Sequence, residues 1–348
     1  MIKTVGIVGG GQLGRMMIPY IKQLGLNVVV LDPDPNCPCA SISHQIVAPF
    51  NDAKGYAELN NLCDVITYEF EHIDVSLLRK MTKPIYPSVD SLEIIQDKYT
   101  QKKALQNKGI PVPGLALEMK PPYMMKARKG GYDGKGNYLV RTDADLVHAR
   151  DALGSDVFCE ELIDFEREVS VIATRGIDGS IVVYPISENV HRNSILDTTT
   201  VPCNLPQDIV ACVFKVARDV MECFGGVGTF CAELFITKDG KVLVNEVAPR
   251  VHNSGHYTIE ATRTSQFENH IRAICGLPLG STEMLVPYAV MKNIIGEHFT
   301  DLKGALSNDG VNVHLYGKTK VAPGRKMGHI TITGSKQHVE KVRSDAKW

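Results

Sequence analysis

The sequence predicts a mixed protein, an α/β unit at the N-terminus followed by α+β units. Apolar strand-like runs alternate with helical apolar spacing through the first hundred or so residues, which is typical of a doubly wound sheet. A glycine-rich loop between two short strands follows, and the rest of the chain is dense in strands. Because 348 residues are too many for one ordinary domain, we expect three, at 1–96, 97–165 and 166–348.

Composition narrows the class of protein. Hydrophobic residues make up 44% of the chain and charged residues 22%, as in a globular protein with a sizeable core. The net charge of -1 supplies no basic excess for nucleic acid. Without an apolar run long enough for a membrane, or a leader, we expect a cytoplasmic protein. The nine cysteines lack paired zinc spacing and are expected to be reduced core thiols.

The first strand, residues 4–9, opens into a glycine-rich turn and a helix predicted over residues 12–24, with Gly25 ending it. The turn reads G-x-G-x-x-G, and Asp32 ends the next strand, which matches a dinucleotide-binding fingerprint. One interpretation is therefore a nicotinamide-dependent oxidoreductase. Any tight strand–helix turn needs glycines, however, and the helix start could equally bind a phosphate or polar substrate.

Further strands are predicted at residues 45–48, 64–72 and 84–87. Glu69 and Glu71 lie at the C-terminal end of a strand, where open α/β sheets bind ligands, although such a carboxylate can also only cap a helix. Residues 88–109 read as one or two helices.

The glycine-rich loop at residues 130–136 is predicted to hold a phosphate. Its backbone N–H groups can close around phosphate oxygens, and Lys126 and Lys135 add positive charge. It is not a Walker loop, because no G-x-x-x-x-G-K-[ST] is present and a strand at 137–141 follows. The loop is therefore expected at a hairpin tip that can fold over a nucleotide; a plain surface turn is the alternative.

Two later strands carry acids at matching positions. Glu233 lies in one strand and Asn245 and Glu246 in the next, joined by a turn at residues 238–240. Antiparallel pairing can place Glu233 opposite the Asn-Glu pair, where the carboxylates would repel unless a Mg²⁺ ion that also holds phosphates lies between them. The alternative, polar faces in water, is disfavoured by the apolar residues on both sides. We also expect strands at 168–173 and 180–185, a polar loop at 188–193 and a helix at 207–224.

Basic and histidine side chains follow the acid-bearing strands. Four polar residues follow the strand that carries Glu246, where a phosphoryl group and a small anion would meet: Arg250, His252, Asn253 and His256. Lys318 and the Arg325-Lys326 turn can clamp a phosphate, since guanidinium forks match its oxygens. A solvated basic turn is the alternative.

These features resemble the ATP-grasp ligases and, more narrowly, the 5-(carboxyamino)imidazole ribonucleotide synthases of purine biosynthesis. The matching stretches run through most of the chain: GGGQLGR at 9–15, YEFEH at 68–72, GGYDGKG at 130–136, NE at 245–246, APRVHNSGHY at 248–257, SQFE at 265–268 and GRKMGH at 324–329.

The resemblance implies an ATP-grasp architecture, with an N-terminal Rossmann-like pre-ATP-grasp domain, a small β-rich lid and a C-terminal α+β domain. It implies carboxylation of the exocyclic amine of 5-aminoimidazole ribonucleotide, using ATP, Mg²⁺ and bicarbonate, through carboxyphosphate. It also implies a homodimer.

The resemblance further implies roles for individual residues. The expected ATP-binding residues are Lys98, Lys126, Gly131, Tyr132, Asp133, Gly134, Lys135, Gly136, Asn137, Glu160, Glu161, Leu162, Ile163, Glu168, His191, Asn245 and Glu246. Substrate binding is expected at Gln12, Leu13, Glu71, Tyr132, Asp133, Lys135, His256, Lys318, Arg325 and Lys326. The metal ligands would be Glu233 and Glu246, and the catalytic residues Arg250, His256 and Lys135.

One segment departs from the family. Residues 114–122 cross directly to the lid strand where family members carry more residues, so a smaller lid is expected. Another ATP-grasp ligase, such as a formate-dependent ribonucleotide transformylase or an amino-acid ligase, and a non-catalytic nucleotide-binding protein are the remaining alternatives.

Overall fold

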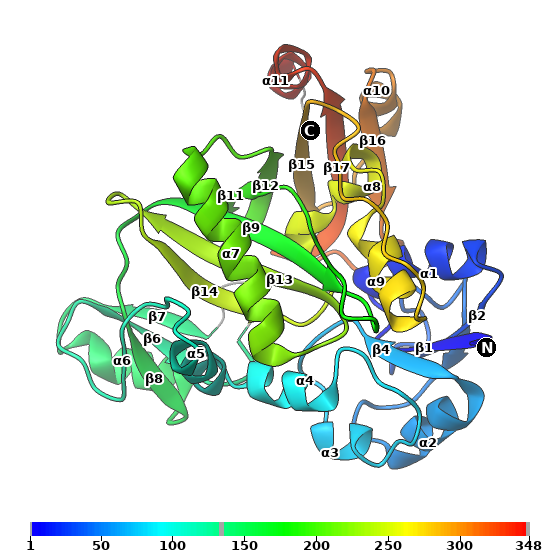
Figure 1. Cartoon of the computed structure of the whole chain (residues 1–348), viewed down its shortest axis with the longest axis horizontal. Helices are drawn as coiled ribbons and strands as arrows, with labels where there is room; N and C mark the ends of the chain where they lie inside the picture. The colour runs from blue at the N-terminus through cyan, green and yellow to red at the C-terminus, as the bar shows by residue number, and fades with distance from the viewer. Residues whose placement is uncertain (1, 132–135, 346–348) are drawn as a thin grey trace.

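The computed structural model describes residues 2–131 and 136–345, and these form three sheets with helices packed around them (Figure 1). The N-terminal sheet is parallel, with strand order β3-β2-β1-β4. Its strands are β1 (Thr4–Val8), β2 (Asn27–Leu31), β3 (His44–Ile46) and β4 (Val65–Tyr68).

Helices cover both faces of this sheet. Val5 and Ile7 pack with residues of α1 (Gln12–Gln23) on one face, and Val8 packs with residues of α2 (Ala53–Leu62) and α3 (Val75–Leu78) on the other. The alternation of buried side chains confirms the doubly wound arrangement. Gly25, with a φ of 72°, ends α1 as expected. The strand expected at 84–87 is wrong in extent, since only a single bridge joins Ile85 to Ile66.

Two helices lead from this sheet to the glycine-rich hairpin. They are α4 (Val89–Gln96) and α5 (Lys98–Asn107), and Asp97 between them caps α5 by accepting a hydrogen bond from the N–H of Thr100. The domain boundary expected after residue 96 lies at this junction, and the boundary expected after residue 165 lies at the start of a long strand. Both boundaries stay predictions.

The second sheet has the strand order β5-β8-β6-β7. Strands β6 and β7 are antiparallel, with Lys126 opposite Asn137, so the expected hairpin is confirmed. Tyr132, Asp133, Gly134 and Lys135 of its tip lie outside the described residues. The elements are β5 (Leu115–Ala116), β6 (Tyr123–Ala127), β7 (Asn137–Val140), α6 (Asp145–Leu153) and β8 (Val157–Glu161).

The third sheet is the largest, with nine strands in the order β14-β13-β9-β11-β12-β15-β17-β16 and β10 beside β9. Residues 188–193, expected as a polar loop, form most of a strand instead. The strands are β9 (Phe165–Arg175), β10 (Ile181–Val183), β11 (Ser187–Arg192), β12 (Ile195–Val201), β13 (Gly228–Thr237), β14 (Val242–Ala248), β15 (Tyr288–Ile295), β16 (Val311–Leu315) and β17 (Lys326–Gly334).

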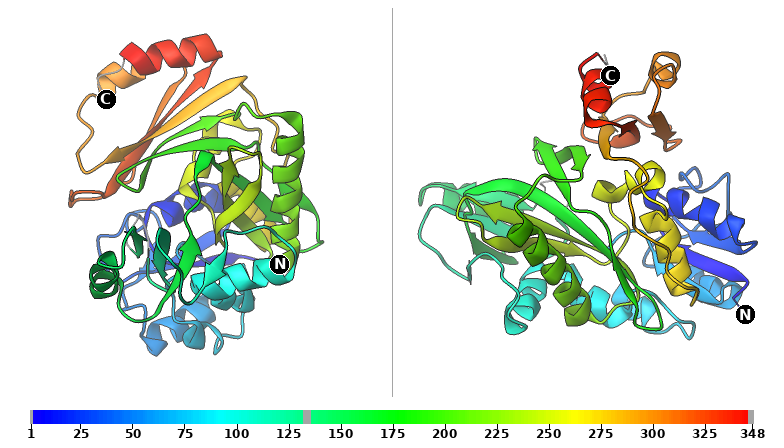
Figure 2. Two further views of the ribbon diagram at one scale, coloured as in Figure 1. Left: turned by 90° about the vertical axis from the view of Figure 1, so that its left-hand side faces the viewer. Right: turned by 45° about the horizontal axis from the view of Figure 1, so that its top comes forward.

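Helix α7 (Gln207–Phe224) lies across one face of this sheet and buries Val213, Val216 and Val220 against it (Figure 1). Strands β15, β16 and β17 project from the rest of the molecule, and α11 (Lys336–Asp345) packs beside them (Figure 2). The remaining helices are η1 (Asn253–Gly255), α8 (Thr258–Ala261), α9 (Gln266–Ile274) and α10 (Leu302–Leu306).

Helix α9 joins the N-terminal sheet to the large sheet. Phe267 and Ile271 pack in the core around α1. On the buried ring of His270, Nδ1 accepts a hydrogen bond from the N–H of Thr229 (3.0 Å), so Nε2 carries the proton and donates to Thr67 Oγ1 (2.8 Å). The ends of β4 and β13 are thereby held in a defined relation, which positions the site described below.

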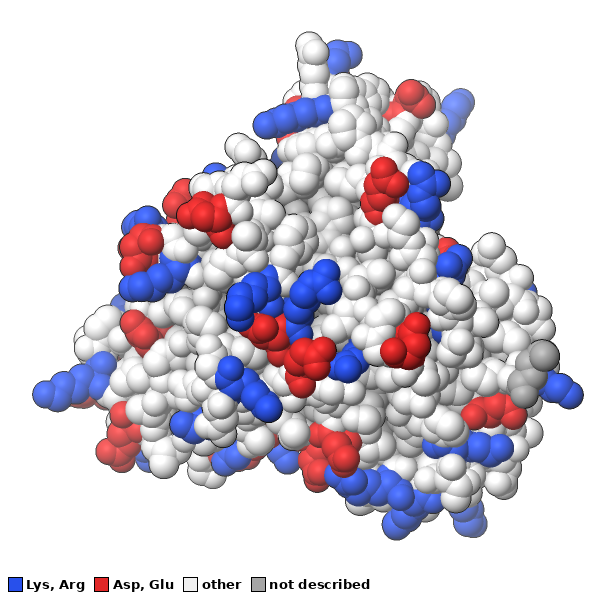
Figure 3. Space-filling model, in the orientation of Figure 1, with Lys and Arg blue, Asp and Glu red and all other residues white. Residues whose placement is uncertain are grey.

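Acidic and basic side chains are interspersed on the face shown in Figure 3, in line with the near-zero net charge. The described helices include none that is long and apolar enough to cross a membrane. All nine cysteines are free thiols; most are buried as expected, but Cys212 is exposed.

Candidate active site

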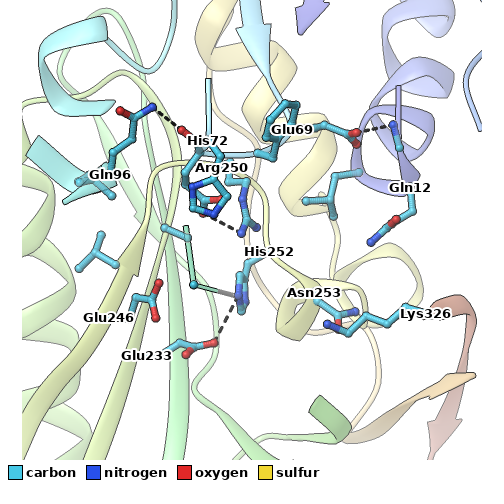
Figure 4. Close-up of a pocket in the computed structure, with 18 of the residues that line it drawn as sticks. Gln12, Glu69, His72, Gln96, Glu233, Glu246, Arg250, His252, Asn253 and Lys326 are labelled. Carbon is cyan, nitrogen blue, oxygen red and sulfur yellow. Dashed lines mark hydrogen bonds and ion pairs between the residues drawn. The ribbon is translucent and has the colours of Figure 1, made fainter. Parts of the chain in front are cut away.

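A cavity of about 870 Å³ lies where the three sheets meet. The ends of β1 and β4 form one wall, β13 and β14 another, and the start of β17 a third. Glu233 and Glu246 lie on one side of the cavity and Gln12 and Lys326 on the other (Figure 4). Of the residues expected in the site, it is lined by Gln12, Leu13, Glu71, Lys98, Gly131, Asn137, Glu168, His191, Glu233, Asn245, Glu246, Arg250, Lys318, Arg325 and Lys326.

Glu233 and Glu246 are direct partners in the ladder between β13 and β14, which confirms the expected register. A bulge follows Glu233. Lys98 Nζ lies 2.9 Å from Glu246 Oε2. Burial would raise the pKa of Glu246, but the ammonium of Lys98 outweighs it and holds that pKa below its usual range.

Glu233 has the opposite environment. Burial and the nearby carboxylates of Glu168 and Glu246 raise its pKa to about 7. His252 Nε2 is 3.3 Å from Glu233 Oε1, but burial and the charge of Arg250 hold the pKa of His252 well below its usual range, so this imidazole stays neutral. The acid pair therefore retains negative charge that a cation would compensate.

These donors fit Mg²⁺. Two carboxylates in register and the Asn245 amide are oxygen ligands of the kind that Mg²⁺ prefers, and that ion usually takes few protein ligands together with phosphate oxygens. Within residues 2–131 and 136–345, no group of three or more His, Cys, Asp or Glu side chains could hold a metal without other ligands. A Mg²⁺ ion that is already bound to phosphate oxygens needs fewer protein ligands, and Glu233 and Glu246 could hold such an ion.

A second charged cluster lies beside Asn245. Lys126 Nζ donates to Asn245 Oδ1 at 3.1 Å and lies 2.6 Å from Glu160 Oε1, and Lys102 Nζ donates to Glu160 Oε2. Burial would raise the pKa of Glu160, but the two ammonium groups outweigh it and lower that pKa. The cluster joins α5, the β6–β8 sheet and β14 behind the cavity wall.

Glu168 and His191 extend the wall on neighbouring strands. His191 Nδ1 is 3.1 Å from Glu168 Oε2. Burial would lower the pKa of His191, but the Glu168 carboxylate outweighs it, so the pKa is raised. The strand β11 that carries His191 was expected to be a loop, and His191 is its residue that lines the cavity.

The two acids of the YEFE stretch have different partners. Glu69 accepts hydrogen bonds from the N–H groups of Gly11 and Gly14 (2.8 Å for Gly14), and thereby caps the start of α1. Asp32 accepts from the N–H of Gly10 at 2.7 Å. The protein's own carboxylates therefore fill the place where a dinucleotide would put its pyrophosphate, which disfavours the oxidoreductase interpretation.

Glu71 also lines the cavity, but its carboxylate lies 2.7 Å from the guanidinium of Arg250. Burial would lower the pKa of Arg250, but Glu71 outweighs it, so the guanidinium stays charged. Its Nε is buried and has no hydrogen-bond partner among the described residues. A buried donor without a partner is costly, so this atom indicates a place for an anionic ligand.

Lys318, Arg325 and Lys326 form the opposite end of the cavity. Lys318 Nζ donates to the carbonyl of Lys326 and Arg325 donates to the carbonyl of Lys320, both at 2.7 Å. These bonds orient the side chains beside Gln12, which lies at the start of α1.

The structure does not bring every expected residue to the cavity. His256 is fully buried against Phe267 and His329, and neither ring nitrogen has a hydrogen-bond partner among the described residues. Lys126, Gly136, Glu160, Glu161, Leu162, Ile163 and His256 do not line the cavity.

His252 and Asn253, both expected after the acid-bearing strand, line the cavity, His252 beside Glu233 and Asn253 nearer Lys326 (Figure 4). Gln96 was not expected in the site; it lines the cavity and donates a hydrogen bond to the carbonyl of Glu71. Lys102 had no expected role at all. Its spacing from Lys98, four residues along a helix, was the one available signal.

Three family models match the chain. The ribonucleotide synthetase preATP-grasp domain matches residues 2–96, the ATP-grasp domain residues 100–267, and the phosphoribosylaminoimidazole carboxylase C-terminal domain residues 289–343.

Known proteins match over nearly the whole chain. The N5-carboxyaminoimidazole ribonucleotide synthase of Bacillus subtilis is 39% identical, over 94% of this chain and 91% of its own. A chloroplastic phosphoribosylaminoimidazole carboxylase of Vigna aconitifolia is 40% identical over 95% of this chain, which spans only 64% of that protein.

A crystal structure has the same fold. It is the N5-carboxyaminoimidazole synthase of Aspergillus clavatus in complex with ADP and 5-aminoimidazole ribonucleotide, with a TM-score of 0.90 and 33% identity over 98% of both chains. Along this chain the matches thus run from the preATP-grasp domain through the ATP-grasp domain to the C-terminal domain. The chain belongs to the N5-carboxyaminoimidazole ribonucleotide synthase family of ATP-grasp ligases.

Proposed function

We propose that the protein uses ATP and bicarbonate to carboxylate the exocyclic amine of 5-aminoimidazole ribonucleotide, giving 5-carboxyaminoimidazole ribonucleotide, ADP and phosphate. The observation that carries the proposal is one cavity with an acid pair at one end, a basic cluster at the other and Arg250 between them. A volume of about 870 Å³ can hold a nucleotide and a second phosphorylated substrate together. The names of the relatives support this substrate pair.

The acid-pair end would bind ATP. Glu233 and Glu246 would hold Mg²⁺, which neutralises charge on the phosphates. Lys98 lies beside Glu246 and would contact a phosphate that approaches the pair. The expected contacts of the glycine loop with ATP, including those of Tyr132 and Lys135, stay predictions because residues 132–135 lie outside the described part of the chain.

The middle of the cavity would hold bicarbonate. A bicarbonate oxygen attacks the γ-phosphorus, the bond to the β-phosphate oxygen breaks, and ADP leaves carboxyphosphate behind. Arg250 would stabilise the transferring anion through its unpartnered Nε, while Glu71 holds its orientation. The ribonucleotide amine then attacks the carboxyl carbon and phosphate leaves. Carboxyphosphate reacts with water, so enclosure favours the carboxylation.

The basic end would hold the ribonucleotide. Lys318, Arg325 and Lys326 supply cations suited to its phosphate, and Gln12 supplies an amide beside them. This arrangement directs the exocyclic amine toward Arg250 and the acid pair.

Phosphate release from ATP and Mg²⁺ tests the proposal, comparing no addition, bicarbonate alone, and bicarbonate with 5-aminoimidazole ribonucleotide. We expect strong stimulation only with both, and a loss on the order of 10²–10³ in Glu246→Gln, because the Mg²⁺ that neutralises charge on the phosphates would lose a carboxylate ligand. Asp239→Asn is the matched control, since this exposed acid lies in the turn of the same hairpin. Stimulation by a different acceptor, or no turnover with any, would contradict the proposal.

A further inference from the structure

Helix α5 sends two lysines to two different sheets. Lys98 and Lys102 are four residues apart, so their side chains lie on one face of the helix. Lys98 pairs with Glu246 of β14 in the large third sheet. Lys102 pairs with Glu160 of β8 in the second sheet, β5-β8-β6-β7, which carries the glycine-rich hairpin and is called the lid here. The helix therefore connects the proposed metal site to the lid.

Lys102 and Glu160 are enclosed, each with a side chain only 2% exposed. Glu160 receives a second ammonium on its other oxygen, from Lys126 at 2.6 Å. Lys126 also donates to Asn245, which lines the cavity. Since an ammonium has three N–H groups, these two contacts leave Lys126 one donor for a ligand.

The charges in this cluster do not cancel. When both lysines are protonated, two ammonium groups face one carboxylate, so one positive charge remains. Without Lys102, Glu160 would neutralise Lys126. A buried ion pair is weak support for stability by itself, because desolvation of its charges offsets their attraction. The cluster's net charge beside the cavity therefore calls for a functional explanation.

We propose that Lys102 is a positioning residue for ATP: it neutralises Glu160, so that Lys126 keeps its positive charge for the phosphates of the nucleotide. The inference rests on the proposed function only in assigning ATP to the acid-pair end of the cavity. A structural tie between α5 and the lid is the competing explanation, and it predicts no dependence of ATP binding on the charge balance of the cluster.

The ionisation of Lys102 offers an additional test. Burial and the charge of Lys126 lower the pKa of Lys102 to about 7, against the opposing effects of Glu160 and Glu246. These groups face it from β6, β8 and β14. As the pH rises through this range Lys102 loses its charge, so the ATP affinity of the wild type should fall toward that of Lys102→Met. ATP itself also titrates in this pH range, so the dissociation constant of the wild type is divided by that of Lys102→Met at each pH to cancel this effect.

The experiment measures the dissociation constant of Mg²⁺-ATP by calorimetry, without the other substrates, and the KM values for both substrates. We expect Lys102→Met to bind ATP about tenfold more weakly, since a unit charge about 10 Å away acts through an effective dielectric constant of about 20. The KM for the ribonucleotide should be unchanged. Lys103→Met is the control, because this exposed neighbour only bonds Gln106.

Charge rescue separates the two explanations. In Lys102→Met with Glu160→Gln, Lys126 regains its uncompensated charge, so ATP affinity should return to within about threefold of wild type. Persistent weak binding in this double variant, or unchanged binding in Lys102→Met, would overturn the inference. If Lys102→Met does not fold, Glu160→Gln decides alone: equal or tighter ATP binding supports the inference, and weaker binding contradicts it.

The proposed function can fail independently. A wild-type protein that binds ATP with this charge dependence, yet carboxylates no ribonucleotide, would retain the role of Lys102 and remove the substrate assignment. A protein that carboxylates the ribonucleotide at the full rate, but whose ATP affinity does not depend on the charges of Lys102 and Glu160, would retain the substrate assignment and remove the role of Lys102.

Discussion

The two ends of the cavity hold their cations in different ways. At the acid-pair end, Lys98 and Lys126 pair with carboxylates in a largely enclosed wall. At the basic end, Lys318 and Arg325 donate to backbone carbonyl oxygens. A carboxylate partner neutralises a cation as well as orienting it, whereas a carbonyl mainly orients it. The acid-pair end thus combines each of these cations with a carboxylate, whereas at the basic end a carbonyl oxygen orients the guanidinium of Arg325.

Arg250 belongs to both arrangements. One face of its guanidinium pairs with Glu71, while Nε keeps an unused donor. In the proposed reaction, the two ends would bind separate anions and the reacting groups would meet at this arginine.

The largest loss of activity is expected from a substitution of Arg250, which lies between the two ends of the cavity. Arg250→Met should reduce phosphate release with all substrates on the order of 10²–10³, because a donor to the transferring anion is lost. ATP binding measured by calorimetry should change little. The Arg250→Met/Glu71→Gln double variant controls for the acid left without a partner, which costs about 3–5 kcal/mol when fully buried. An equal loss of ATP binding would place Arg250 at the nucleotide end.

Two substitutions, one at each end of the cavity, test whether the two ends bind different substrates. Lys98→Met should raise the KM for ATP about tenfold, and Arg325→Met should raise the KM for the ribonucleotide by a similar factor, since each removes one charged contact. Steady-state kinetics with each substrate varied in turn measures both. If either variant raised both KM values together, the two ends would not be independent.

A smaller effect is expected from pH at the acid-pair end. Mg²⁺ binds the carboxylate form, and the pKa of Glu233 is raised to about 7 by burial and neighbouring acids. Below that pH the proton competes with the metal, so the Mg²⁺ affinity should fall by up to about tenfold per pH unit.

Calorimetric titration of Mg²⁺ in the presence of ADP at several pH values tests this dependence. Glu233→Gln should bind Mg²⁺ more weakly and lose the part of the pH dependence that Glu233 supplies. Equal Mg²⁺ affinity across this pH range in the wild type would show that Glu233 does not compete for protons.

Local patterns in the sequence predicted much of this site. The partnership of Glu233 and Glu246 was predictable because a short turn sets the register of a hairpin. The hairpin of β6 and β7 was predictable because a glycine-rich loop separates two short strand-like runs. Strand β11 was missed because residues 188–193 are mostly polar and lack the apolar alternation of an ordinary strand.

The remaining differences depend on long-range packing. Glu69 and Glu71 both follow the end of β4, where strand alternation no longer decides which side chain faces the ligand. The short helix η1 directs His252 to the cavity and His256 into the core. Lys102 looks like its surface neighbour Lys103 in the sequence, and only the lid packed on α5 makes it buried.

The carboxylate at the start of α1 changes how a glycine fingerprint should be interpreted. A side chain on Gly11 would collide with Glu69, and Gly9 adopts a φ of 98° beside the same acid. The glycines are thus required by a part of the chain itself, with no cofactor involved. The spacing of the glycines alone indicates a crowded strand–helix junction. A search for cofactor sites would therefore produce fewer false matches if it first asked whether an acid from the adjacent strand already occupies the turn.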